Sequence, residues 1–251
     1  MKPENSPVRA KKLVLAPAVK AALAESRALT NESQIAHSLE ALIVVWSEVL
    51  EYQSVASLNE FVTSLVGRYT GGSHWCPRDD GIREWADFFS VFADIMEVGD
   101  IAGVEWWIRR QSGLESKNFH FDKDEQLFEK EGRFATPVYG SVFYLSEGGG
   151  PTLVAAQRID SVGELSPSVP SELAAVDCGL NRLLKFPGDL NHGVLGCKID
   201  KLRTTLIMNW WGTIPMGVEL TPPRINLPKI TLASPNCIRP RLFQGSIFLE
   251  D

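Results

Sequence analysis

The spacing of apolar residues changes near residue 103, from a helical period before it to short β-rich runs after it. Two helices are expected in the first part of the helical region, before about residue 70. One would begin after a cap at Asn31 or Ser33, and its apolar positions are Ile35, Leu39, Leu42, Trp46 and Val49. The next is expected to open at the capping box Ser57-Leu58-Asn59-Glu60 and to end at Gly67.

A third expected helix has the clearest pattern. It starts after Asp79 and Asp80, ends at Gly99, and carries an aromatic stripe that includes Trp85 and Phe92. An aromatic stripe is either a ligand surface or a core-facing surface, and packing against a sheet is the favoured interpretation. The three helices together predict a helical block over residues 31–100.

Short β-rich runs with turn residues between them fill the rest of the chain. The expected strands are 104–110, 119–122, 137–145, 152–157, 183–186, 193–198, 203–211 and 241–248. Strands that follow a helical block predict an α+β fold in which helices pack against a jelly roll or related barrel. We therefore expect a tail or weak helix over residues 1–30, the helical block over 31–100, and a β core over 101–251. The helical block and the core should form one integrated domain.

Composition fits a globular chain and narrows the partners. Of the 251 residues, 44% are hydrophobic and 22% are charged, which is ordinary for a soluble domain. The net charge of −6 argues against nucleic acid, which needs clustered Lys and Arg. No apolar run approaches the roughly 20 residues of a membrane span, and no secretion signal is apparent. The four cysteines are far apart, so we expect reduced thiols and a cytoplasmic protein without a membrane partner.

Among the four histidines, one is followed two residues later by an aspartate. His120 and Asp122 lie in a strand pattern, where residues i and i+2 point to the same face. His192 follows seventy residues later, after the turn Pro187-Gly188-Asp189. Two imidazoles and one carboxylate on one face of an octahedral ion leave its other face open, as in non-haem Fe(II) oxygenases. His120, Asp122 and His192 are therefore the predicted metal ligands and catalytic residues.

An arginine inside an apolar strand is the second chemical signal. Arg203 opens the run 203–211, and a buried guanidinium requires an anionic partner. Its planar fork suits a carboxylate held at two points. Thr205 shares its face and offers a hydroxyl. If both face a cofactor, strand alternation also sends Asn209 and Trp211 inward, either to line the substrate end of the pocket or to close the core.

These motifs resemble the double-stranded β-helix of the Fe(II)/2-oxoglutarate-dependent dioxygenases, nearest to the prolyl-hydroxylase branch. The resemblance covers residues 104–211. It is carried by the His120-Phe121-Asp122 strand, Tyr144-Leu145, the turn Gly149-Gly150-Pro151-Thr152, the stretch from Gly188-Asp189 to His192, and Arg203-Thr204-Thr205. One departure is the strand 106–111, where that branch carries a Tyr and this chain carries none.

The resemblance implies site roles residue by residue. His120, Asp122 and His192 would hold Fe(II), and Arg203 would bind the distal carboxylate of 2-oxoglutarate. Tyr144 matches a tyrosine that also bonds this carboxylate, with a packed strand residue as the alternative. Gln111 would lie beside the cofactor in place of the missing Tyr.

The resemblance also implies the reaction. With O2, and ascorbate as a possible reductant, the enzyme would oxidise a C–H bond and release succinate and CO2. The retained Asp122 favours hydroxylation, desaturation or cyclisation over halogenation. The expected substrate is a small molecule such as an amino acid or natural-product intermediate.

Several alternatives stay open. The chain would otherwise be a protein or peptide hydroxylase of the prolyl-hydroxylase type, or a non-catalytic jelly-roll binding protein. A zinc site on His74, Cys76 and the other cysteines is a weaker hypothesis, because the close ligand pairs of structural zinc sites are missing. Asp124 and Glu125 would attract a cationic substrate, or would form a solvated loop. The oligomeric state is not predicted.

Overall fold

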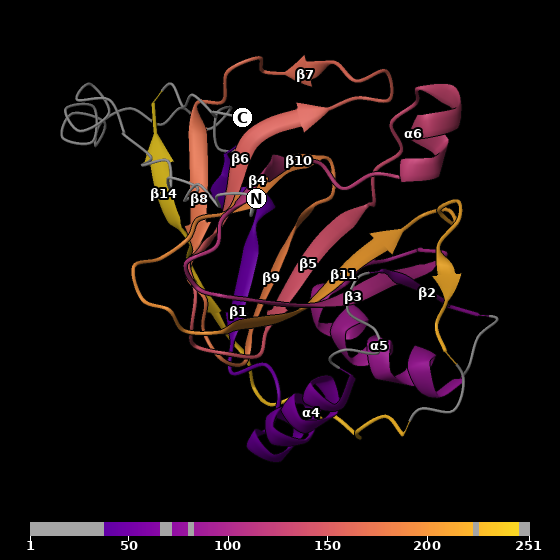
Figure 1. The fold of residues 1–251 in the computed structure, drawn as a ribbon, viewed down its shortest axis with the longest axis vertical. Coiled ribbons are helices and arrows are strands. Elements are labelled where there is room, and N and C mark those ends of the chain that lie inside the picture. Colours follow the sequence, from indigo (N-terminus) through magenta and orange to yellow (C-terminus); the bar gives the residue numbers. More distant parts are fainter. Residues whose placement is uncertain (1–37, 66–71, 80–82, 223–225, 246–251) are drawn as a thin grey trace, which may run out of the picture.

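Two facing β-sheets form the centre of the protein in the computed structural model, which describes residues 38–65, 72–79, 83–222 and 226–245 (Figure 1). The predicted tail over residues 1–30 lies outside these ranges. The larger sheet has the strand order β12-β2-β3-β11-β5-β9-β1-β13 and the smaller has β14-β8-β6-β10-β4 with β7 paired to β6. The strand bounds are β1 Val44–Ser47, β2 His74–Pro77, β3 Gly103–Gln111, β4 Lys117–His120, β5 Tyr139–Tyr144, β6 Thr152–Ile159, β7 Leu165–Ser166, β8 Glu172–Val176, β9 Arg182–Pro187, β10 Leu190–Val194, β11 Arg203–Trp211, β12 Glu219–Leu220, β13 Asn236–Ile238 and β14 Arg241–Gln244.

The eight principal strands follow the topology of a jelly roll. Counted from β3 to β11 without the short β7, the first strand pairs with the eighth, the second with the seventh, the third with the sixth and the fourth with the fifth. All four pairs are antiparallel, as in a double-sheet jelly roll. Apolar side chains of both sheets meet between them, including Val142 of β5, Val154 of β6 and Phe186 of β9. The predicted jelly-roll core is confirmed.

The helical block expected over residues 31–100 is only partly helical. The helices are α3 (Leu39–Leu42), α4 (Tyr52–Leu65) and α5 (Arg83–Met96) before the core, and α6 (Glu125–Glu131) after β4. Strands β1 and β2 interrupt the block and join the large sheet. None of the helices in the described ranges is long and apolar enough to cross a bilayer. The prediction of one integrated domain stays a prediction.

The helix predicted from Ile35 to Val49 is confirmed only over α3 (Leu39–Leu42), because the β-branched residues after it form a strand. Its predicted caps, Asn31 and Ser33, and residues 35–37 lie outside the described ranges. Ile43, Val44 and Val45 adjoin one another, and such side chains favour strands. Strand β1 gains ladder partners on both sides, in β9 and β13. The predicted capping box is wrong, because α4 begins at Tyr52 and Ser57 lies inside it.

The third predicted helix is confirmed as α5, which covers one face of the large sheet. Trp85, Phe88, Phe89 and Phe92 of α5 are buried. They pack in one cluster with alternate residues of β11, namely Leu206, Met208 and Trp210. Figure 1 shows α4 and α5 together on one side of the molecule and α6 apart from them. Of the other alternate residues of β11, Arg203, Ile207 and Asn209 line a cavity on the opposite face.

The site-bearing strands differ from the prediction in their bounds. Strand β11 was predicted at its observed bounds, Arg203–Trp211. Strand β4 ends at His120, so Asp122 lies in the segment after the strand rather than within it. Strand β10 begins at Leu190, so His192 lies inside it rather than before it. Strand β8 was not predicted, because its Ala-rich sequence lacks an alternating pattern.

The α5 interface should dominate the stability of the helix-covered face. Phe92 is fully buried, with its ring centroid 5.2 Å from that of Phe143 on β5. We expect Phe92→Ala to lower the free energy of unfolding by about 3–5 kcal/mol, because it leaves a cavity in the core. Urea unfolding followed by circular dichroism measures the change. The matched control is Asp94→Ala on the exposed face of α5, and an equal loss in both variants would contradict this packing.

Candidate metal centre and its cavity

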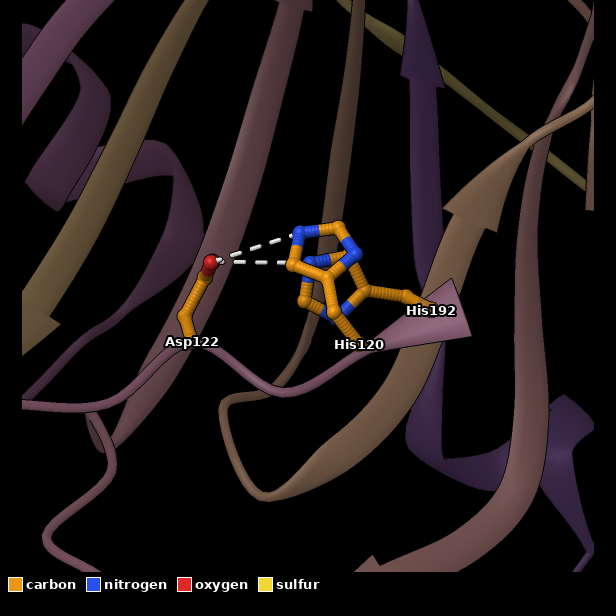
Figure 2. A group of neighbouring side chains, drawn as sticks. All are labelled: His120, Asp122 and His192. Atoms are coloured by element: carbon orange, nitrogen blue, oxygen red, sulfur yellow. Dashed lines mark ion pairs between the residues drawn. The ribbon is translucent and has the colours of Figure 1, made fainter. Parts of the chain in front are cut away.

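Three potential metal ligands converge at one end of the jelly roll. The Nε2 atom of His120 lies 3.6 Å from Oδ1 of Asp122, and the Nε2 atom of His192 lies 3.4 Å from Oδ2. The two imidazole centroids are 4.5 Å apart. Figure 2 shows the carboxylate of Asp122 directed at both rings. One ligand atom from each residue lies within 4.8 Å of the others, so the structure brings the three predicted ligands together.

Neighbouring strands position the two histidines. His120 and His192 are partners in the β4–β10 ladder, which places both rings side by side. Asp122 lies two residues beyond β4, in the segment that leads to α6. Two residues further on, Asp124 caps α6 by accepting from the Leu127 amide at 2.9 Å. Its other carboxylate oxygen accepts from the Met216 amide at 2.7 Å. The cap anchors the segment after β4, and Asp124 therefore has a structural partner rather than an open ligand position.

Backbone carbonyl groups orient both imidazoles for metal binding. Nδ1 of His120 lies 2.9 Å from the carbonyl oxygen of Asn118, and Nδ1 of His192 lies 3.0 Å from that of Leu190. A carbonyl accepts only, so each Nδ1 carries a proton, and the neutral form of each ring presents its lone pair at Nε2. Carbonyl groups behind ligating histidines fix the tautomer in this way in metal sites. The two rings thus have the tautomer that a metal at Nε2 requires.

The electrostatics of the triad favour a carboxylate and oppose protonation of one histidine. Burial alone would raise the pKa of Asp122, but the adjacent imidazoles, His192 foremost, hold it well below its usual range. Burial and the neighbouring His192 lower the pKa of His120 to about 4. Burial also opposes charge on His192, yet its contact with Asp122 raises the pKa of His192 above its ordinary value. Without a metal, His192 beside Asp122 therefore keeps a proton to a higher pH than a free imidazole does.

Asn209 supports the carboxylate from β11. Its Nδ2 donates to Oδ2 of Asp122 at 3.1 Å, and its side chain is 2% exposed. Asn209 also lines the cavity in front of the triad, whereas Trp211 is absent from the lining. The Trp211 indole instead donates to Glu105 at 2.9 Å. Of the two residues predicted at the substrate end, the structure brings Asn209 to the cavity and Trp211 behind it.

Arg203 is a buried cation without an anionic partner in the described residues. Its side chain is 2% exposed, and it takes part in none of the ion pairs. Nη2 donates to the Thr152 hydroxyl at 2.9 Å, while Nε has no hydrogen-bond partner. Its guanidinium carbon lies 5.4 Å from the centre of the Tyr144 ring. A buried unpaired charge is costly, so this guanidinium needs an anion supplied from the cavity that it lines.

The other predicted cofactor residues surround Arg203. Tyr144 is fully buried and its hydroxyl donates to Thr152 at 2.6 Å, so it acts behind Thr152 rather than on the cavity wall. Thr205 is fully buried and its hydroxyl has no partner in the described structure. Gln111 lies opposite Arg203 in the β3–β11 ladder and lines the cavity, where its Oε1 accepts from Arg109.

Thr152 is the site residue that the sequence motifs contained but did not single out. It accepts hydrogen bonds from both Tyr144 and Arg203, so its own hydroxyl hydrogen is left to donate into the cavity that it lines. The turn before Thr152 passes so close to Arg203 that it requires glycine. A Cβ on Gly149, whose φ is +98°, would lie 2.6 Å from the Arg203 side chain. The Gly149-Gly150-Pro151-Thr152 turn was the signal that pointed to this residue.

The triad and Arg203 line one cavity of about 550 Å³. Apolar walls come from Val142, Phe186 and Ile207, and charged residues from β3 and the segments around β4 complete it. Glu105 lies on this wall, and burial raises its pKa. Glu125, the second predicted acidic contact, is paired with Lys123 at 2.8 Å. Among the described residues, His120, Asp122 and His192 are the one group able to hold a metal, so the hypothesis of a zinc site on His74 and Cys76 gains no support.

Comparison with known proteins yields matches in structure but not in sequence. No protein-family model matches the chain, and no curated protein matches it in sequence. A prolyl-4-hydroxylase from Pseudomonas putida is 14% identical with a TM-score of 0.44, over 68% of this chain and 88% of that one. EctD from S. alaskensis is 16% identical with a TM-score of 0.47, over 78% and 84% of the two chains. HygX from Streptomyces hygroscopicus, with nickel and 2-oxoglutarate bound, is 13% identical with a TM-score of 0.45, over 74% and 88%. At these values, any assignment depends on the residues of the chain itself.

The raised pKa of His192 predicts that metal binding releases a proton and depends on pH. At about pH 6, His192 is mostly protonated and His120, with a pKa of about 4, is mostly neutral. Binding of Zn(II) should therefore release about one proton, and affinity should fall about tenfold per unit as the pH drops further towards 5. Calorimetry in two buffers of different ionisation enthalpy counts the protons. Release of no proton, or of two, would contradict the charge state derived for the two rings.

Proposed function

We propose that this protein is an Fe(II)- and 2-oxoglutarate-dependent oxygenase that oxidises a C–H bond of a small molecule. One observation carries the proposal: the buried, unpaired Arg203 lines the same cavity as the converged triad His120, Asp122 and His192. A metal site and an anion site in one cavity suit a ligand that chelates the metal at one end and has a carboxylate at the other. 2-Oxoglutarate has this form.

The donor set fits iron. Two imidazole nitrogens and one carboxylate oxygen form the arrangement of non-haem Fe(II) oxygenases, which leaves positions open for other ligands. His120, Asp122 and His192 would hold the ion. Asn209 would keep the Asp122 carboxylate in place through its hydrogen bond, as outer-shell partners do in metal sites.

The residues around Arg203 fit the distal carboxylate of 2-oxoglutarate. Arg203 would supply the planar cationic fork, and Thr152 would donate its free hydroxyl hydrogen. Tyr144 would hold Thr152. The unpartnered hydroxyl of Thr205, two residues from Arg203 on the same face of β11, offers a second neutral donor. Gln111 would border the cofactor from β3.

With iron, 2-oxoglutarate and O2 bound, the site would supply an oxidant for an unactivated C–H bond, with release of succinate and CO2 and with ascorbate as a possible reductant. The chain would position the reactants and limit the access of water. Val142, Phe186 and Ile207 provide the apolar wall for this purpose. The retained carboxylate Asp122 supports hydroxylation, desaturation or cyclisation as the outcome.

The cavity size supports a small-molecule substrate, such as an amino acid or natural-product intermediate. Its volume of about 550 Å³ lies within the range of roughly 300–1,000 Å³ for small-molecule sites. A peptide hydroxylase is the second candidate within the same chemistry. A binding protein without turnover would have no use for a metal face with open positions beside an anion site.

Arg203 tests the cofactor assignment. Arg203→Lys should retain metal affinity but weaken 2-oxoglutarate about ten- to hundredfold, because an ammonium cannot grip a carboxylate with a planar fork and a charged hydrogen bond is lost. Calorimetry with Zn(II) in place of iron measures both affinities. Arg133→Lys on the surface, with its side chain 65% exposed, is the matched control. Unchanged 2-oxoglutarate affinity in Arg203→Lys would make the arginine structural.

Turnover without a substrate tests the enzyme assignment. The purified protein with Fe(II), ascorbate and 2-oxoglutarate should release succinate slowly in air and none under nitrogen. Asp122→Ala should lose this release, because removal of the carboxylate weakens the metal site. Succinate is measured by mass spectrometry, with the Arg133→Lys protein as the control. Failure of the wild-type protein to bind both Fe(II) and 2-oxoglutarate would refute the oxygenase assignment and favour a binding protein.

A further inference from the structure

Strand β3 gives the cavity a wall with two chemically different ends. Glu105, Trp107, Arg109 and Gln111 alternate along β3 and all four line the cavity. Their ladder partners on β11 are, in the same order, Asn209, Ile207, Thr205 and Arg203. Gln111 therefore marks the Arg203 end of the wall. Glu105 marks the other end, opposite Asn209, which donates to Asp122.

Glu105 is fixed by hydrogen bonds but has no cationic partner among the described residues. Burial raises the pKa of Glu105, while hydrogen bonds with Ser73 and with the Trp211 indole, which donates to Oε2 at 2.9 Å, favour the charged form. In the described part of the chain it takes part in no ion pair. Two neutral donors fix the side chain, while its burial leaves the negative charge uncompensated. A cation that enters the cavity would supply the missing compensation.

Glu105 is not a fourth metal ligand in this arrangement. The group of ligand atoms within 4.8 Å of one another contains His120, Asp122 and His192 but not Glu105. Its ladder partner Asn209 contacts Asp122, so Glu105 lies next to the triad without joining it. A group bound to Glu105 would thus be held beside the metal rather than on it.

Trp107 adds a second feature on the same wall. It lies two residues from Glu105, on the same face of β3, and lines the cavity. An aromatic ring attracts cations through the negative charge of its π-face, most strongly for Trp. A carboxylate and an indole that share one wall are the chemistry that recognises an ammonium group.

We propose that Glu105 and Trp107 form a subsite for an ammonium group of the substrate. The inference rests on the proposed function, which it deepens: the substrate is an amine, held by its cation so that a carbon near the nitrogen faces the triad. Trp211 is a positioning residue in this subsite, because it acts through Glu105. The buried indole of Trp211 would thus hold the Glu105 carboxylate in place, although Trp211 itself does not line the cavity.

The test compares two probes of one length, 1-aminopentane and pentan-1-ol, which differ in the ammonium group alone. Binding to the full chain is measured by ligand-observed NMR titration, with and without Zn(II) and 2-oxoglutarate. The amine should bind the wild-type protein at least about tenfold more tightly than the alcohol, because a charged hydrogen bond is stronger than a neutral one. Equal binding of both probes, or binding of neither, overturns the proposal.

Variants locate the selectivity. Glu105→Gln keeps an oxygen that accepts from Trp211, so we expect a folded protein in which the advantage of the amine is lost and the alcohol is unaffected. Trp107→Leu should weaken the amine several-fold. Glu84→Gln, which removes an exposed carboxylate from α5, should keep the wild-type selectivity. A Glu105→Gln protein that still prefers the amine overturns the subsite, and thermal unfolding verifies that each variant is folded.

The outcome separates this subsite from the oxygenase assignment. Amine selectivity without binding of Fe(II) or 2-oxoglutarate would retain the subsite and refute the proposed function. Binding of both cofactors without amine selectivity would retain the function and refute the subsite.

Discussion

Strand β11 carries the constraint on which the site depends, because its two faces serve two different environments. Leu206, Met208 and Trp210 pack against the helix-covered core, and the alternate residues Arg203 and Asn209 line the cavity. A shift of the strand by one residue would exchange these faces and place the guanidinium in the apolar core. The ladder with β3 is unbroken from Arg203↔Gln111 to Trp211↔Gly103. The packing of α5 on one face therefore fixes the chemistry on the other.

Local chemistry made one part of the site predictable from sequence. The types and spacing of His120, Asp122 and His192 predicted a metal set, which the structure brings together, and the charge of Arg203 in an apolar run predicted an anion site. Both inferences depend on side-chain chemistry, which survives an error of a few residues in strand bounds. Asp122 indeed lies beyond β4 rather than within it, yet its carboxylate still meets both rings.

Tertiary pairing decided what the sequence could not predict. Strand β1 forms because β9 and β13 supply partners on both sides, and those partners are remote in sequence. Ala-rich β8 likewise depends on β6 and β14. Thr152 and Glu105 take their significance from Arg203 and Trp211, which they contact across the fold. Such cross-strand relations have no local period, so hydrophobic spacing did not reveal them.

The charges of the residues that line the cavity favour a particular order of ligand binding. Asp122 favours a proton on His192 in the metal-free triad, and a divalent ion would replace that proton. The ion with Asp122 would leave one net positive charge, and Arg203 would add another. A dianion such as 2-oxoglutarate cancels both, and its binding should therefore be favoured once the metal is present. Glu105 then remains on the wall as a carboxyl group that takes part in none of the ion pairs of the described residues. Because Glu105 is partly buried, its attraction for a cation is stronger than in bulk water, and a cationic substrate is favoured at this end of the wall.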